Sequence, residues 1–384
     1  MGYKRLGDYI REVNVRNREL KVTKLFGLTI DKAFIPSVAN VIGTDLSNYK
    51  VIRREQFACS LMQVSRDGKM PVAMYEEDEA IMSPAYPMFE VIDKTALLPQ
   101  YLMMWFSRSE FDREASYYAV GGVRGSLTWE DFCNMQLPVP SIDRQREIVE
   151  EYETLSRRIR LNEQMIEKLE ATAQALYRKM FVDGIDKENL PEGWRMGTLG
   201  EVVESYSKTH KFNKKALIFL NTSDVLDGKI MLHEYSDVEN MPGQAKKEIA
   251  NGDILFSEIR PANKRYAIVK EEHPEDFVVS TKLMVLRIKD NSYSNLKVYF
   301  YLTLPDVLGD LQKQADGASG TFPQITFDGN LKNREIVIGD KDTEKEWERY
   351  LSVYYNNVWI RERENSRLTE LQSLLLAKMG RLKQ

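Results

Sequence analysis

Residues 148–180 read IVEEYETLSRRIRLNEQMIEKLEATAQALYRKM, and residues 347–379 read WERYLSVYYNNVWIRERENSRLTELQSLLLAKM. In both stretches mostly apolar residues recur at alternating steps of four and three, which is the spacing of a coiled-coil seam. The two frames coincide, since Ile148 and Met180 correspond to Trp347 and Met379. The sequence therefore predicts two long helices that pack along these seams.

The heptad stretches divide the chain into four segments. We predict a first mixed α/β domain over residues 1–140, a helical spacer over 141–184, a second domain over 190–338 and a second helical spacer over 341–384. Because the chain leaves the first domain along one helix and must return along the other, the helices should run antiparallel. We therefore expect an α+β fold in which an antiparallel coiled coil relates the two copies by a pseudo-two-fold axis.

The duplication extends into the globular segments. Leu6-Gly7-Asp8-Tyr9-Ile10 matches Leu199-Gly200-Glu201-Val202-Val203, and Phe57-Ala58-Cys59-Ser60 resembles Ile254-Leu255-Phe256-Ser257. These apolar runs predict strands. Each copy continues with one helical pattern, residues 101–118 or 296–315, and then with a glycine loop, residues 121–125 or 317–320. The shared order indicates two diverged copies of one domain.

Composition limits the class of protein. A chain of 384 residues with 43% apolar residues can bury two domain cores. Cys59 and Cys133 lie in apolar contexts without CxxC spacing, so we expect buried thiols and not metal or redox chemistry. Charged residues occur throughout the first twenty positions, which argues against a signal peptide or a transmembrane helix. The expected compartment is the cytoplasm.

The net charge of −4 argues against a protein that binds DNA alone, because phosphate neutralisation supplies most non-specific affinity. The charge is not uniform, however. A local basic loop contains Lys208, His210, Lys211, Lys214 and Lys215, whereas acidic runs lie at residues 76–79 and 271–272. Affinity for DNA could thus come partly from partner subunits.

Three further segments carry a family resemblance. Residues 137–148 read LPVPSIDRQREI, residues 190–194 read LPEGW, and residues 252–261 read GDILFSEIRP. In this order and in a duplicated chain, they resemble the DNA-specificity subunit of type I restriction–modification systems. The chain departs from that pattern at Ile338-Gly339-Asp340-Lys341, which replaces the proline-bearing entry to the second spacer. The sequence therefore predicts the first residue of the second helix only to within about one helical turn.

The resemblance implies two target-recognition domains that read a bipartite site in double-stranded DNA. It implies two copies of an adenine methyltransferase subunit as partners, together with restriction/translocase subunits. S-adenosylmethionine, ATP and Mg are expected only on those partners, and this chain is expected to be non-catalytic. A two-headed coiled-coil adaptor that joins proteins is the alternative.

The residues agree with a non-catalytic chain. The Asn/Asp-Pro-Pro-aromatic tetrapeptide of amino-methyltransferases is missing, and so is a Gly-x-Gly nucleotide turn. Asp253 with Glu258 faintly resembles a nuclease carboxylate cluster, but its basic position is arginine, Arg260, so we interpret the segment as the end of a surface strand. The three histidines, His210, His233 and His273, are too scattered for a zinc motif. No metal site is predicted.

Candidate DNA contacts are cationic and amide side chains in predicted turns and glycine loops, because these groups bind phosphates and base edges. For each one the alternative is a solvated surface charge. Arg66 and Arg260 rank first, and Arg124 could instead cap a helix. The candidates are Arg53, Arg54, Arg66, Lys69 and Arg124 in the first domain, and Lys208, Lys211, Lys214, Arg260, Asn263, Lys264, Arg265 and Gln324 in the second.

The middle of the seam is polar. Asn162, Arg361 and Asn365 interrupt otherwise apolar positions. They could meet in one polar layer that sets the register, or the helices could be splayed and hydrated there. The residues expected to pair the helices are Leu155, Ile159, Asn162, Ile166, Leu169, Val358, Arg361, Asn365 and Leu368.

Overall fold

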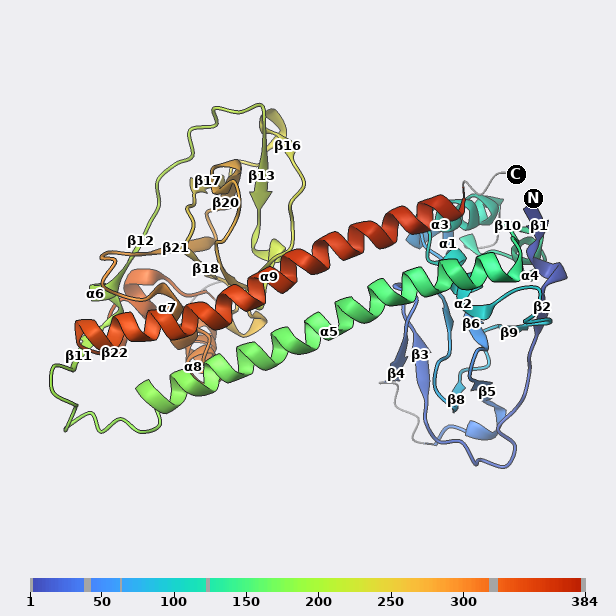
Figure 1. The fold of residues 1–384 in the computed structure, drawn as a ribbon, viewed down its shortest axis with the longest axis horizontal. Helices are drawn as coiled ribbons and strands as arrows, with labels where there is room; N and C mark the ends of the chain where they lie inside the picture. Colours follow the sequence, from blue (N-terminus) through green and yellow to red (C-terminus); the bar gives the residue numbers. More distant parts are fainter. Residues whose placement is uncertain (1–2, 38–42, 63, 122–124, 318–323, 381–384) are drawn as a thin grey trace. The chain divides into compact units, whose positions relative to one another are not determined.

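The computed structural model describes residues 3–37, 43–62, 64–121, 125–317 and 324–380 (Figure 1). The chain forms two compact units, residues 1–163 with 362–384, and residues 164–361. Each long helix, α5 (Ile142–Phe181) and α9 (Lys341–Met379), begins in one unit and ends in the other. Both units contain helices and strands, which confirms the predicted α+β class.

The first unit is built on small antiparallel sheets. Its strands are β1 (Tyr3–Arg5), β2 (Ile10–Glu12), β3 (Phe26–Leu28), β4 (Phe34–Pro36), β5 (Lys50–Arg53), β6 (Phe57–Cys59), β7 (Val72–Met74), β8 (Glu79–Met82), β9 (Met88–Val91) and β10 (Gln136–Pro138). The central sheet has the order β2-β9-β6-β7, and the two-stranded sheets are β1-β10, β3-β4 and β5-β8. Pairing of β1 with β10 brings the start of the domain to the segment that enters α5.

The second unit repeats this plan with more strands. Its strands are β11 (Arg195–Thr198), β12 (Val203–Ser205), β13 (Ala216–Leu220), β14 (Val225–Leu226), β15 (Lys229–Ile230), β16 (Ser236–Asp237), β17 (Ala245–Glu248), β18 (Ile254–Ser257), β19 (Tyr266–Ile268), β20 (Phe277–Ser280), β21 (Leu283–Ile288) and β22 (Glu335–Ile338). The order β12-β21-β18-β19 repeats the central sheet of the first unit, and β11-β22 repeats β1-β10. A second sheet has the order β16-β13-β20-β17.

One long-range hydrogen bond shows how closely the two copies correspond. The backbone N–H of Leu127 donates to the carbonyl of Leu61 at 2.8 Å, and that of Ile325 donates to the carbonyl of Glu258 at 2.8 Å. In both units this bond ties the segment after the glycine loop to the turn that follows the central strand, β6 or β18. The two turns therefore occupy equivalent places in the two domains.

The helical pattern that we expected to form one helix in each copy forms two. These are α2 (Pro99–Phe106) and α3 (Ser109–Tyr118) in the first unit, and α7 (Asn295–Leu302) and α8 (Pro305–Asp316) in the second. Arg108 has the extended backbone of a helix N-cap, and Pro305 lacks the N–H that a continuous helix needs. The prediction of single helices was wrong because apolar periodicity continues across both breaks.

Shorter helices complete the description. They are α1 (Val64–Asp67) and α4 (Trp129–Asn134) in the first unit, and α6 (Leu199–Val202) in the second. Thr128 caps α4 by accepting from the backbone N–H of Asp131 at 3.0 Å. Such caps satisfy the free N–H groups of a first helical turn.

The long helices are part of both cores. Ile148 and Val149 of α5 and Met379 of α9 belong to the core of the first unit. Tyr177 and Phe181 of α5, with Trp347 and Leu351 of α9, belong to the main core of the second. All twenty residues of the two heptad frames are at least partly buried. Helix α9 begins at Lys341, a start that the sequence predicted only to within about one helical turn.

The helices run antiparallel within the first unit. Gln372 donates to Ser156 at 2.7 Å, and Asn162 donates to Asn365 at 2.8 Å. Residue numbers that increase along α5 therefore meet residue numbers that decrease along α9. Asn162 also donates to Glu364 at 3.0 Å. Asn162 and Asn365 thus form a polar layer, whereas Arg361 donates to Asn357 one turn earlier in α9.

Candidate nucleic-acid interface

Arg66 and Lys69 lie in the connection between β6 and β7, at one end of this hairpin. Residues 66–69 were expected to form a turn, but Arg66 lies in the short helix α1 and the chain turns at Gly68, where φ is +66°. Arg66 donates to Asp67 at 2.7 Å, and Lys69 pairs with Asp31 at 3.1 Å. Both cations are exposed.

Arg53 and Arg54 lie at the other end of the same hairpin. Arg53 is the last residue of β5 and Arg54 begins the turn to β6. Arg53 pairs with Glu79 at 3.8 Å and Arg54 with Asp78 at 2.8 Å. Since β6 and β7 pair antiparallel, this turn and the β6–β7 connection are at opposite ends of the strands. The structure therefore does not bring the four cations into one surface. Arg124, the fifth candidate, lies outside the described residues.

The equivalent connection in the second unit, residues 258–265, has an unusual backbone. Arg260 and Lys264 have φ of +47° and +54°, in the left-handed region that side chains other than glycine rarely adopt. Lys264 pairs with Asp227 at 3.2 Å. Arg265 donates to the carbonyls of Ser223 at 2.9 Å and Val225 at 3.3 Å. Its guanidinium therefore joins this connection to residues 223–225 of the same unit.

Arg260 and Asn263 differ from their neighbours. Both are exposed, and neither side chain has a hydrogen-bond or ion-pair partner among the residues that the structure describes. Strained backbone persists only where the surrounding structure imposes it, and it is concentrated at functional sites. The turn thus presents a guanidinium and an amide to solvent. We call residues 258–265 with Gln324 and Lys282 the reading turn.

The basic loop lies along the edge strand β17. The backbone N–H of His210 donates to the carbonyl of Lys246 at 2.7 Å, and that of Glu248 donates to Lys208 at 3.0 Å. Lys208 pairs with Glu248 at 2.8 Å and Lys214 pairs with Asp276. For Lys211, which is exposed, no partner is found in the described part of the chain.

Two further cations, Lys246 beside this loop and Lys282 in the reading turn, were missed by sequence reasoning. Lys246 is exposed on β17, next to the buried Lys247. Lys282 pairs with Glu258 at 3.6 Å and donates to Gln324 at 3.4 Å. The pair Lys246-Lys247 in a strand was a usable signal, because successive strand residues point to opposite faces and one of the two must face outward.

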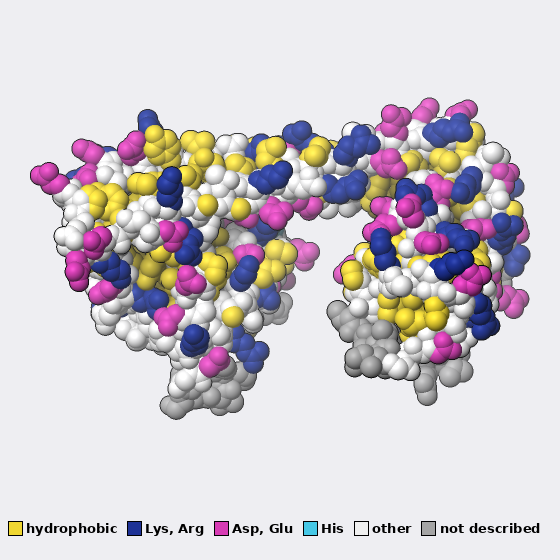
Figure 2. Space-filling model, turned by 90° about the horizontal axis from the view of Figure 1, so that it is seen from below, with side chains coloured by type: hydrophobic (Ala, Val, Ile, Leu, Met, Phe, Trp, Pro, Cys, Tyr) yellow, Lys and Arg dark blue, Asp and Glu magenta, His cyan; other side chains and the backbone are white. Residues whose placement is uncertain are grey.

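The ion pairs leave these cations available for phosphate. Hydrogen bonds to Glu248 and Asp276 raise the pKa of Lys208 and of Lys214, so both stay charged at neutral pH. The side chains of Lys208 and Lys214 are 56% and 44% exposed, so a phosphate can approach both ammonium groups. It can replace the Glu248 carboxylate more readily than that of Asp276, which is buried. Figure 2 shows basic and acidic side chains interspersed on the face that it presents, without one continuous basic patch.

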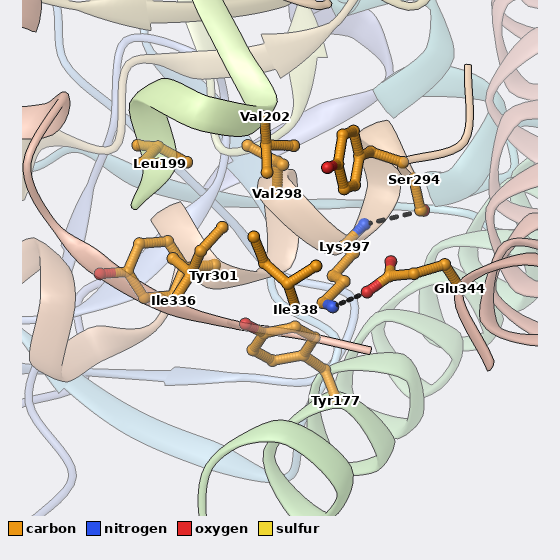
Figure 3. A pocket seen from close by; sticks show the side chains of 11 residues that line it. Tyr177, Leu199, Val202, Ser294, Lys297, Val298, Tyr301, Ile336, Ile338 and Glu344 are labelled. Atoms are coloured by element: carbon orange, nitrogen blue, oxygen red, sulfur yellow. Dashed lines mark hydrogen bonds and ion pairs between the residues drawn. The ribbon is translucent and has the colours of Figure 1, made fainter. Parts of the chain in front are cut away.

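A small cavity in the second unit contains a buried ion pair (Figure 3). Lys297 of α7 pairs with Glu344 of α9, and its ammonium lies 4.0 Å from the centre of the Phe181 ring. Glu344 also accepts from the backbone N–H of Gly339 at 2.9 Å. The cavity measures about 10 Å³, which leaves room for no more than one water molecule. It is an anchor for the helix and not a ligand site.

The same helix position holds a buried polar anchor in the first unit. Gln145, which corresponds to Glu344 in the heptad frame, is fully buried. It accepts from the N–H of Leu98 at 2.9 Å and donates to the carbonyls of Ala96 at 2.8 Å and Pro140 at 2.9 Å. In both copies, a buried polar side chain thus ties the start of the long helix to its own globular domain.

The described residues offer little for other chemistry. Within the described ranges, no group of three or more His, Cys, Asp or Glu side chains could hold a metal ion. Burial raises the pKa of the Cys59 thiol, and Cys133 is half-buried. In the same ranges, no helix combines the length and apolar character that a membrane crossing requires.

Comparison with known proteins identifies the family. The family model for the type I restriction modification DNA specificity domain matches residues 64–171 and 191–370. The type I restriction enzyme HindI specificity subunit of Haemophilus influenzae is 39% identical over 153 residues, which are 40% of this chain and 33% of that protein. The match thus spans about a third of this relative's length.

Two solved structures are similar over nearly the whole chain. The S subunit of a type I restriction–modification system from M. genitalium has a TM-score of 0.60 at 12% identity, covering 98% of this chain and 95% of that one. The HsdS subunit of Thermoanaerobacter tengcongensis has a TM-score of 0.36 at 20% identity, covering 98% and 96%. The first likeness supports the fold.

The matched family model is a DNA specificity domain and not a catalytic one, and it covers most of the sequence in two segments. This chain therefore belongs to the family of type I restriction–modification DNA-specificity subunits.

Proposed function

We propose that the chain reads a bipartite site in double-stranded DNA, one half-site per globular domain, and directs adenine methylation and restriction by partner subunits. The proposed partners are two copies of an adenine methyltransferase subunit and restriction/translocase subunits in the cytoplasm. S-adenosylmethionine, ATP and Mg belong to those partners. The observation that carries the proposal is the reading turn, where the backbone is strained and where Arg260 and Asn263 are exposed without a partner among the described residues.

The side chains of the reading turn suit base recognition. A guanidinium can donate two hydrogen bonds to guanine O6 and N7, and an amide can pair with adenine N6 and N7. Lys208, Lys211 and Lys246 lie along β17, whose first residue pairs with the last residue of β20, just before Lys282. We assign them to the phosphate backbone, which fixes the position of the protein on the duplex without specifying sequence.

The proposal is tested by selection from a pool of random DNA duplexes. The purified chain is mixed with its methyltransferase partner, and bound duplexes are sequenced. Enrichment of one motif with two defined parts separated by unspecified bases supports the proposal. Absence of any enrichment would contradict it and would favour the adaptor that only joins proteins.

Replacement of Arg260 is the sharpest test at a single residue. Arg260→Ala should weaken binding to the selected duplex by about 1–3 kcal/mol, roughly 10- to 100-fold, and relax specificity in one half-site. Lys211→Ala should weaken binding evenly across sequences and reduce the salt slope by about 0.9. Fluorescence anisotropy over a range of salt concentrations measures both.

Lys187→Ala is the matched control for this test. Lys187 lies in the connection between α5 and β11 and pairs with Glu335 at 3.4 Å, so its replacement removes the same charge away from the reading turn. Its effect on affinity should be small. Equal losses from Arg260→Ala and Lys187→Ala would show that only net charge matters and that the turn does not read bases.

A further inference from the structure

The first unit exposes apolar side chains beside the β6–β7 connection. Tyr117 and Val120 are 77% and 75% exposed, and Tyr118 and Met62 are also exposed. The Tyr117 and Tyr118 rings are in edge-on contact, with centroids 5.8 Å apart. Single exposed apolar residues are common, but a group of them indicates an interaction surface. We call Met62, Tyr117, Tyr118 and Val120 the apolar tip.

The fold holds the apolar tip next to the cations of the β6–β7 connection. Ser116 of α3 donates to the carbonyl of Val64 in α1 at 3.3 Å, and the backbone N–H of Met70 donates to Asp112 of α3 at 3.1 Å. Phe111, Ala115 and Ala119 face the core, whereas the side chain of Tyr117 lies on the solvent side of α3. Arg66, Lys69 and Arg113 are exposed on the same elements.

The second copy shows that the domain fold does not require an apolar tip. When the buried residues Ala119 and Ala315 are aligned, Tyr117, Tyr118 and Val120 correspond to Lys313, Gln314 and Asp316. A duplicated fold therefore has polar residues at these positions in one copy and apolar residues in the other. The difference lies beside equivalent turns, where the two domains are proposed to read different half-sites.

We propose that Tyr117 and Val120 form an apolar wedge that inserts at a base step of the half-site read by the first domain. This inference rests on the proposed function. An apolar side chain that enters the stack separates neighbouring bases and kinks the duplex, and sequences that deform easily are then preferred. The neighbouring cations Arg66, Lys69 and Arg113 pair with Asp67, Asp31 and Glu110 in the structure. Because the cations are exposed, each can exchange its carboxylate for a phosphate on either side of such a step. The first domain would thus read its half-site partly through DNA deformability.

The test compares the full chain, with its methyltransferase partner, and the double variant Tyr117→Ser, Val120→Ser on the duplex selected by the original chain. The variant should bind roughly tenfold or more weakly, because one stacked side chain contributes a factor of this size. 2-Aminopurine placed at successive positions of the first half-site should become brighter at one step with the original chain and not with the variant. Tyr117→Phe should retain both properties, because it keeps the ring.

The matched control is Ile92→Ser, which also removes an exposed apolar side chain in the first unit but lies just after β9, away from the tip. It should leave affinity and 2-aminopurine fluorescence unchanged. If the double variant keeps its affinity and its fluorescence change, the wedge is wrong although the proposed function stands. If the variant instead loses the methyltransferase partner in co-purification, the tip is a protein contact and the wedge is also wrong. A chain that selects no DNA motif overturns the proposed function and this inference together.

Discussion

Lys297→Ala is expected to lower the free energy of unfolding of the second unit by about 3–5 kcal/mol. Lys297 and Glu344 are 6% and 3% exposed, and they join α7 of the globular domain to α9 (Figure 3). Removing the ammonium leaves the Glu344 carboxylate buried, with the Gly339 N–H as its one remaining partner among the described residues. Burial already lowers the pKa of Lys297, while Glu344 opposes this shift, so the pair depends on both members.

A double variant separates the ion pair from simple packing. Lys297→Met with Glu344→Gln removes both charges, keeps an acceptor for the Gly339 N–H, and places at position 344 the residue type found at Gln145 in the first unit. It should recover most of the lost stability, because replacing a buried pair by uncharged groups of similar size is often neutral. Urea unfolding followed by tryptophan fluorescence measures each variant. A single variant as stable as the original chain would show that the pair is not an anchor.

Under the proposed bipartite reading, lengthening both helices by one heptad is expected to lengthen the DNA spacer between the two half-sites by about three base pairs. Seven residues add about 10 Å to a helix, and one base pair occupies about 3.4 Å. The inserts belong after Ile166 in α5 and after Ile360 in α9. In these places they preserve the contact of Asn162 with Asn365 in the first unit and that of Phe181 with Trp347 in the second. Both half-site sequences should stay the same, because no turn is altered.

The measurement is selection from duplexes with randomised spacer length, performed with the methyltransferase partner. A heptad inserted into α5 alone is the control, and it should abolish selection because only one of the two seams is lengthened. A doubly lengthened chain that still selects the original spacer would show that the helices do not set the distance. The added rotation around the duplex should weaken binding without changing the bases read.

Local patterns in the sequence were sufficient to predict the two long helices and the internal duplication. A heptad frame states which residues share a face, and all twenty frame residues are at least partly buried in the structure. The repeat was visible for the same reason, since matching apolar runs form matching strands in the orders β2-β9-β6-β7 and β12-β21-β18-β19. The helix breaks at Arg108 and Pro305 were missed because apolar spacing alone does not report a local change of backbone.

The candidate site depended on contacts that no local pattern contains. Arg260 and Arg265 lie five residues apart in one predicted turn. Arg265 donates to carbonyls about forty residues away, whereas the Arg260 side chain has no partner among the described residues. Lys208 and Lys246 are far apart in the sequence, and only the backbone hydrogen bonds between residues 208–210 and β17 bring them together. Lys297 and Glu344 lie on different helices, and only packing of α9 against α7 makes them an anchor. Periodicity along the chain determines which face a side chain occupies, because that depends on the backbone repeat alone, whereas the partner that it meets there depends on how distant segments pack.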